Sequence, residues 1–210
     1  MFDGILFDLD GTLWNAVPQL AKSWTFGLQE LGVRQEPVTE QELYPCMGLL
    51  LEDIVERLSP GLEAREKQRV LDHCCRTENE FLSRHGAPLY PGEEAVLTDL
   101  SRRYPLFVVS NCEKGYIEAY FAGTGMGKYF TDFESAGNTG LPKSENIALV
   151  VKRHGLKRPV YVGDTALDCR SAQEAGVPFI HAAYGFGQAE GVPAIHSLEA
   201  LPSLLEQLEG

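Results

Sequence analysis

The sequence of 210 residues lacks the cysteine and histidine patterns of disulfide frameworks and common zinc sites. Its five cysteines form no C-x-x-C pair, and their number is odd. Small disulfide-bonded domains usually carry an even set of cysteines, and structural zinc sites usually pair them. The five histidines show no H-E-x-x-H spacing. We therefore expect reduced thiols, and histidines with structural or surface roles.

Long apolar runs are also missing. No stretch reaches the roughly 18 apolar residues that a membrane-spanning helix needs, and no basic and apolar leader precedes the first strand-like segment. We expect a protein that is neither secreted nor inserted in a membrane. The sequence thus predicts a cytoplasmic monomer or homodimer without a membrane partner.

Positive charge is scarce, with 18 Lys and Arg against 30 Asp and Glu and a formal net charge of −12. Nucleic acid binds mainly through contacts of Lys and Arg with phosphates, so the composition disfavours a nucleic-acid partner. A small anionic substrate remains compatible, because a few local cations and a metal ion can reverse the sign of one pocket. With 44% hydrophobic and 23% charged residues, the chain is typical of a globular protein.

The N-terminal stretch FDGILFDLDGTL is the most informative part of the chain. An apolar run, residues 5–7, leads to two acids, Asp8 and Asp10, and then to Gly11 and Thr12. This pattern predicts a buried strand that ends in a loop, where neighbouring carboxylates can share a cation. An ordinary Asp-Gly turn after a strand is the alternative.

From residue 88 to the C-terminus, strand-like apolar segments alternate with amphipathic helical ones. Such alternation indicates βαβ units, parallel strands and right-handed crossovers. The first strand is of the same type, so the sequence predicts an α/β fold with a Rossmann-like parallel sheet. The predicted strands are 106–110, 129–134, 160–162 and 178–181, and the predicted helices are 92–103, 114–122, 143–154, 166–175 and 198–208.

Residues 15–85 contain no convincing strand. Apolar residues recur there at helical spacing, as in Leu20, Trp24, Leu28 and Leu31. We therefore expect an inserted all-helical cap domain at 15–85 on a core domain made of 1–14 and 86–210. The helices predicted in the cap are 18–31, 41–47, 49–58 and 62–84.

Two other predicted strands end in polar residues. Ser110 ends the second strand and Asn111 follows it, and both can donate hydrogen bonds to a phosphate, although Ser-Asn also forms simple turns. Asp164 and Asp168 follow the fourth strand, one helical turn apart, so both carboxylates can face the same side. Alternatively, Asp164 is a helix N-cap and Asp168 an exposed acid. Ligands of parallel sheets bind at the carboxyl ends of the strands, which favours a shared site.

Lys143 is the candidate counter-charge for these acids. It lies at the start of the predicted helix 143–154, where a phosphate is favoured by the helix dipole. A surface lysine is the alternative interpretation.

Taken together, these segments resemble the haloacid dehalogenase-like hydrolases, in the branch similar to phosphoglycolate phosphatase. Asp8-Leu9-Asp10-Gly11-Thr12 resembles the first motif of that family, and Ser110 and Lys143 resemble the second and third. The segment Gly163-Asp164 to Asp168 resembles the fourth motif.

The resemblance implies a Mg²⁺-dependent phosphatase of a small phosphorylated metabolite. Asp8 would be the nucleophile that forms an aspartyl-phosphate, and Asp10 the general acid and base. Ser110, Asn111 and Lys143 would bind the phosphoryl group. Mg²⁺ would be held by Asp8, the backbone carbonyl of Asp10, and Asp164, with Asp168 orienting Lys143 or the waters on the metal. These metal-binding and phosphate-binding roles are also what the resemblance implies.

Three other functions compete with this prediction. A phosphomutase related to β-phosphoglucomutase would share every motif, but its relatives carry an arginine where this chain has Leu51. A dehalogenase is disfavoured because that branch lacks the acid at Asp10. A non-catalytic phosphate-binding or regulatory module would need a disabling change that the sequence does not contain.

Overall fold

The centre of the protein, described here from a computed structural model of residues 1–210, is a six-stranded sheet in which every pairing is parallel. The strand order is β3-β2-β1-β4-β5-β6. From β1 the chain adds β2 and β3 on one side and then β4, β5 and β6 on the other, so the topological switch point lies between β1 and β4. This is the arrangement whose ligand crevice lies beyond the carboxyl ends of the central strands. The strands are β1 (Gly4–Phe7), β2 (Leu106–Ser110), β3 (Asp132–Ser135), β4 (Pro159–Gly163), β5 (Phe179–Ala182) and β6 (Ala194–Ile195).

Helices make up most of the remaining regular structure. Between β1 and β2 the chain forms helices only. Those helices are α1 (Val17–Glu30), α2 (Glu40–Leu43), the 3₁₀ turn η1 (Tyr44–Cys46), α3 (Leu51–Leu58), α4 (Ala64–His85) and α5 (Glu93–Leu100). After β2 come α6 (Tyr116–Thr124), η2 (Met126–Tyr129), α7 (Ala136–Thr139), α8 (Lys143–His154), α9 (Ala166–Glu174), η3 (Leu198–Ala200) and α10 (Leu201–Glu209).

The central strands are buried on both faces. Successive side chains of a strand point to opposite faces, and β1 follows this rule. Leu6 packs in the cluster that α8 and α9 cover, whereas Ile5 and Phe7 pack in the larger cluster on the other face. Because both faces need apolar residues, β1 is a continuous apolar run without polar alternation. The expectation of an α/β fold with a Rossmann-like parallel sheet is confirmed.

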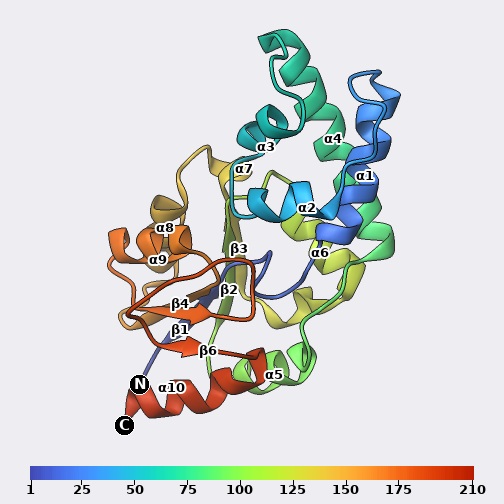
Figure 1. Ribbon diagram of the computed structural model, residues 1–210. Helices are drawn as coiled ribbons and strands as arrows, with labels where there is room; N and C mark the ends of the chain where they lie inside the picture. The colour runs from blue at the N-terminus through green and yellow to red at the C-terminus, as the bar shows by residue number, and fades with distance from the viewer.

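Helices α1 to α4 gather at one end of the molecule, at the top of Figure 1. Both chain termini lie at the opposite end, beside α10. Helix α4 packs against α1 and also against α6, which follows β2. The larger apolar cluster therefore continues from the sheet into these helices, with Trp24 and Val70 among its buried members. The division into a core domain and a cap domain at 15–85 stays a prediction.

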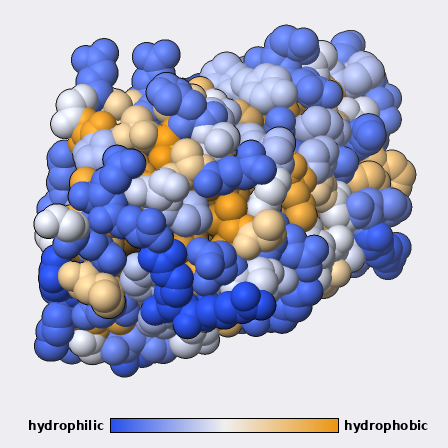
Figure 2. Space-filling model, turned by 90° about the horizontal axis from the view of Figure 1, so that it is seen from below, coloured by the Kyte–Doolittle hydropathy of each residue, from blue (hydrophilic) through white to orange (hydrophobic).

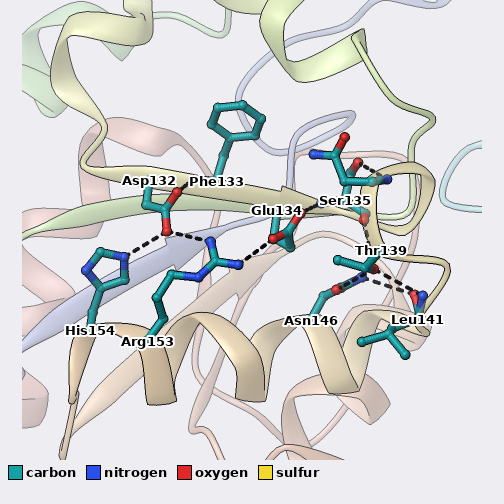
Figure 3. Close-up of polar contacts among 10 residues, drawn as sticks. Asp132, Phe133, Glu134, Ser135, Thr139, Leu141, Asn146, Arg153 and His154 are labelled. Carbon is teal, nitrogen blue, oxygen red and sulfur yellow. Dashed lines mark hydrogen bonds and ion pairs between the residues drawn. The ribbon is translucent and has the colours of Figure 1, made fainter.

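Ion pairs at the C-terminal end of helix α8 connect this helix to β3 (Figure 3). The Arg153 guanidinium lies 2.8 Å from Asp132 and 2.6 Å from Glu134, and His154 Nε2 lies 2.8 Å from Asp132. At the other end of the helix, Thr139 Oγ1 donates to Asn146 Oδ1 over 2.8 Å. These contacts hold both ends of α8, and so they position the residue that begins it, Lys143.

Hydrophilic residues cover most of the face at the end that carries the termini, and hydrophobic ones appear there as small separate patches (Figure 2). No helix of the chain combines the length and the apolar composition that crossing a membrane requires.

Several boundaries differ from the expectations. The helix predicted at 92–103 ends at Leu100, because residues 101–103 form turns that lead to β2. The strand predicted at 129–134 begins only at Asp132, after the 3₁₀ turn η2. The short elements α7 and β6 were not predicted. An edge strand of two residues carries too little periodicity to be recognised.

Candidate active site

Four acids and one lysine lie close together at the carboxyl ends of β1 and β4. Asp8 follows β1 directly, and Asp164 follows β4. Phe7 and Val162 are register partners, and the Asp8 amide donates to the Val162 carbonyl over 2.8 Å, so the two strand ends are level with each other. One carboxylate oxygen from each of Asp8, Asp164 and Asp168 lies within 4.8 Å of the others.

Lys143 lies between two of these carboxylates. Its Nζ is 2.7 Å from Asp8 Oδ1 and 2.5 Å from Asp168 Oδ1, and all three side chains are buried. Burial alone would lower the pKa of Lys143, but the Asp168 and Asp8 carboxylates raise it well above its ordinary value. The lysine is therefore a permanent cation, and it fixes the Asp8 carboxylate at the strand end.

Asp168 uses its second oxygen within the chain. Thr165 and Asp168 form a capping box at the start of α9, in which Asp168 Oδ2 accepts from the Thr165 amide and from its hydroxyl. With Lys143 on Oδ1, both oxygens of Asp168 have donors. This arrangement suits a residue that orients Lys143 better than one that binds a metal ion directly.

Asp164 has one satisfied and one free oxygen. Its Oδ2 accepts a hydrogen bond of 2.7 Å from the Phe186 amide, whereas its buried Oδ1 has no partner. Gly11 and Gly185 come so close that a Cβ at either position would collide with Asp164. Both glycines therefore allow backbone to surround this carboxylate. An unpaired buried carboxylate oxygen is costly, and a bound cation would remove that cost.

Burial and mutual repulsion raise the pKa of three acids in the site. The pKa of Asp8 is raised to about 6 by burial and by Asp168, against the opposing effect of Lys143. Burial and the charge of Asp8 raise the pKa of Asp10 to about 7 and that of Asp164 to about 8. The single lysine does not balance four carboxylates. The donor set, all oxygen and strongly anionic, fits a hard divalent cation such as Mg²⁺.

The carboxylate of Asp10 points away from this cluster. Its Oδ1 accepts a hydrogen bond of 3.0 Å from the hydroxyl of Tyr116, the first residue of α6. The backbones of Asp10 and Trp14 also form an isolated β-bridge, just after the end of β1. The two acids of the first motif are thus turned to different partners, Asp8 to Lys143 and Asp10 to Tyr116.

A partly open cavity lies beside these residues. Asp8, Asp10, Ser110 and Asn111 line one side of it, and residues of α1, α3 and α4 line the other. The Asn111 amide donates to the Gly48 carbonyl over 3.1 Å, which joins the loop after β2 to the loop before α3. A small substrate in this cavity would touch both the strand ends and the helices.

The structure brings all seven candidate residues to the same end of the sheet. Asp8, Asp10, Ser110 and Asn111 reach the cavity, while Lys143 and Asp168 lie behind Asp8. Two residues that contribute to the site were not predicted, Tyr116 and the buried Glu78 of α4. Neither belongs to a local motif, so only the packing of α4 and α6 reveals them.

Comparison with known proteins identifies the family. The sequence model of the family described as haloacid dehalogenase-like hydrolase matches residues 5–182. The chain belongs to this family. Its expected classification as a hydrolase similar to phosphoglycolate phosphatases is therefore confirmed.

Curated relatives and solved structures agree with this classification. A phosphoglycolate phosphatase from Cupriavidus necator is 27% identical, over 96% of this chain and 92% of the relative. One from Vibrio parahaemolyticus is 26% identical, over 98% and 94%. A haloacid dehalogenase-like hydrolase structure from Streptococcus pneumoniae superposes with a TM-score of 0.81 at 21% identity, covering 97% of this chain and 98% of the other.

Proposed function

We propose that the protein is a Mg²⁺-dependent phosphatase that hydrolyses a small phosphorylated metabolite through an aspartyl-phosphate on Asp8. The observation that carries this proposal is the placement of Asp8 and Asp10 on one wall of the cavity with different hydrogen-bond partners. A nucleophile and a general acid that act on one substrate must both lie close to it, and they need different surroundings so that one is ionised while the other is protonated. The phosphatase names of the curated relatives support the same activity.

The first half of the reaction transfers the phosphoryl group to the protein. The Asp8 carboxylate attacks phosphorus, and the bond from phosphorus to the ester oxygen breaks. Asp10 gives its proton to the departing oxygen. The pKa of Asp10, raised to about 7, lets it hold that proton near neutral pH. Lys143 keeps Asp8 aligned, and Ser110 and Asn111 donate hydrogen bonds to the phosphoryl oxygens.

The second half releases phosphate. Asp10, now ionised, takes a proton from a water molecule, and the water oxygen attacks phosphorus. The bond between phosphorus and Asp8 breaks, which restores both acids. Asp8, Asp164 and the backbone carbonyl of Asp10 would hold Mg²⁺, which supplies positive charge for an anionic phosphoryl group approaching a carboxylate.

The predicted cap at 15–85 would form the substrate-recognising wall of the cavity, on a core of 1–14 and 86–210. Leu20, Met47 and Leu51 come from that segment and line the cavity. Leu51 also bears on the phosphomutase alternative, because it places an apolar side chain where a second phosphate would need a cation. A cytoplasmic location and a monomeric or dimeric state remain predictions from the sequence.

Replacement of the nucleophile tests the proposal. Asp8→Asn keeps the shape of the side chain but removes its nucleophilic charge, so phosphate release should fall by roughly a thousandfold or more. The assay is release of inorganic phosphate from a panel of phosphorylated metabolites with Mg²⁺. The exposed Asp99→Asn is the matched control and should behave as wild type. Activity of Asp8→Asn within tenfold of wild type would contradict the assignment.

A further inference from the structure

The cavity beside Asp8 is lined by acidic residues and by no basic residue. Its charged lining residues are Asp8, Asp10, Glu78 and Glu113, and no Lys, Arg or His is among the lining residues. Lys143 does not line the cavity, and its ammonium group is already shared between Asp8 and Asp168. An anion bound farther in would therefore find no side-chain cation.

Much of the remaining lining is apolar. Leu20, Leu43, Met47, Leu51 and Ile54 form the wall on the side of the helices. An apolar wall removes water from whatever it contacts, and an unpaired charge in such a place is strongly disfavoured. Helix α3 begins beside the cavity, but the positive end of its dipole already carries Glu52 and Asp53.

Glu78 is the one charged residue of α4 that reaches the cavity. It is only 3% exposed, and its Oε2 accepts a hydrogen bond of 2.6 Å from Trp24 Nε1. Its Oε1 makes no hydrogen bond within the chain and is not completely buried. This oxygen is therefore available to a ligand in the cavity. Burial raises the pKa of Glu78 to about 8, so near neutral pH this carboxyl holds a proton and would ionise only beside a positively charged group.

We propose that the cavity selects phosphate monoesters whose leaving group carries no negative charge and offers a hydroxyl or ammonium donor to Glu78. This inference rests on the proposed phosphatase function and adds its substrate class. The apolar wall would contact the carbon skeleton, and Glu78 would accept the donor. A leaving group with a carboxylate or a second phosphate would place an anion against the apolar wall, where no side-chain cation balances it. Phosphoglycolate, whose leaving group carries a carboxylate, should therefore be a poor substrate, in contrast to what the names of the relatives suggest.

The test compares linear phosphate monoesters of two to six carbons that differ only in their terminal group: methyl, hydroxyl, ammonium or carboxylate. At the best chain length, kcat/KM for the hydroxyl or ammonium ester should exceed that of the methyl ester about three- to tenfold, the usual effect of one hydrogen bond. The carboxylate ester should lie at least about tenfold below the hydroxyl ester. A carboxylate ester that is hydrolysed as fast as the hydroxyl ester at every length would overturn the proposal.

Variants locate the effect at the cavity wall. Glu78→Gln keeps an acceptor for Trp24 but removes the acid, so the preference for ammonium over carboxylate should shrink several-fold. Met47→Lys adds a cation to a partly exposed position of the wall and should shift the preference toward carboxylate. Glu80→Gln, exposed on the same helix, is the control and should leave all ratios unchanged. Unchanged ratios in both cavity variants would also overturn the proposal.

Two further measurements separate this inference from the proposed function. Turnover of an aryl phosphate reports on the catalytic residues alone. If the aryl phosphate is hydrolysed and no preference among the esters appears, the inference fails and the phosphatase function stands. If the aryl phosphate is not hydrolysed, the function fails. Calorimetric binding of the same esters to Asp8→Asn then still decides the preference of the cavity.

Discussion

Asp8 and Asp10 are two residues apart, yet they have different surroundings. Asp8 is held by a permanent cation, Lys143, whereas Asp10 accepts a hydrogen bond from an uncharged phenol, Tyr116. The pKa of Asp8 is raised less than that of Asp10, to about 6 against about 7. The environment thus favours the ionised form of the proposed nucleophile and the protonated form of the proposed acid.

Asp10→Asn should separate the two roles. Without an acid, esters with poor leaving groups should be attacked far more slowly, whereas an aryl phosphate, whose phenolate needs little protonation, should still react. Water attack on the phosphorylated Asp8 should slow as well, because no base remains. Rapid-quench kinetics with an aryl phosphate should therefore show a burst of product, and intact mass should show one trapped phosphoryl group. Equal slowing of aryl and alkyl esters without a trapped intermediate would mean that Asp10 only positions other groups.

Asp164→Asn tests the cation site without a need for turnover. In wild type, Mg²⁺ should raise the melting temperature, because a ligand that binds only the folded state stabilises it. In the variant this increase should be much smaller, while the metal-free protein should be at least as stable as wild type, since a buried acid with an unpaired oxygen is gone. Chelation should stop wild-type turnover reversibly. Equal Mg²⁺-induced shifts in both proteins, or full turnover in excess chelator, would contradict the predicted metal role.

The sequence allows the positions of residues at strand ends to be predicted, but not those of residues that helix packing brings to the cavity. Asp8 and Asp164 each follow a recognisable apolar strand and Ser110 ends one, so their meeting at one edge of the sheet follows from topology. Tyr116 and Glu78 lie on helices, where an aromatic or acidic residue has many ordinary uses. Their position depends on how α4 and α6 cross, which no local pattern records.

At the scale of elements, the long periodic segments were predicted closely and the short ones were not. The helix expected at 62–84 is α4, Ala64–His85, and the one expected at 143–154 is α8 with the same ends. The 3₁₀ turns and the two-residue β6 depend on contacts with neighbouring segments. A run of two to four residues carries too little periodicity to compete with those contacts.

Helices α5 and α6 are joined by a buried acid, which gives a pH prediction. Glu93 is 2% exposed, accepts a hydrogen bond of 2.5 Å from Tyr120, and has its pKa raised by burial to about 8. Between the ordinary value of 4.5 and 8, the unfolded chain loses this proton and the folded chain keeps it. Stability should therefore fall as pH rises through this window, by up to about 1.4 kcal/mol per pH unit from this group.

Glu93→Gln keeps an acceptor for Tyr120 and removes the titration. Melting temperatures measured from pH 5 to 8 should decline less steeply for this variant than for wild type. The exposed Glu118→Gln on α6 serves as the control and should follow wild type. A variant as sensitive to pH as wild type would mean that Glu93 does not retain its proton in the folded state.

At the scale of the molecule, one apolar cluster includes residues of the sheet, of α6 and of the helices between β1 and β2. Since Trp24, Val70 and Tyr116 belong to the same cluster as Phe7, we expect the predicted cap and core to unfold together. In urea, far-ultraviolet circular dichroism and the fluorescence of Trp14 and Trp24 should give the same midpoint. Two separate midpoints would show that the helices unfold independently of the sheet.

The central place of β1 also matters while the chain is being synthesised. β1 is the first strand to be made, yet its neighbours β2 and β4 begin at Leu106 and Pro159. At about 5–20 residues per second, β4 is complete roughly ten to thirty seconds after β1. Until β2 has been made, roughly five to twenty seconds after β1 at the same rate, the apolar segment 5–7 has no partner on either edge, and the later pairing closes long loops, which slows folding. The apolar strand that directly precedes the proposed nucleophile is therefore exposed early in synthesis, when a chaperone could bind it.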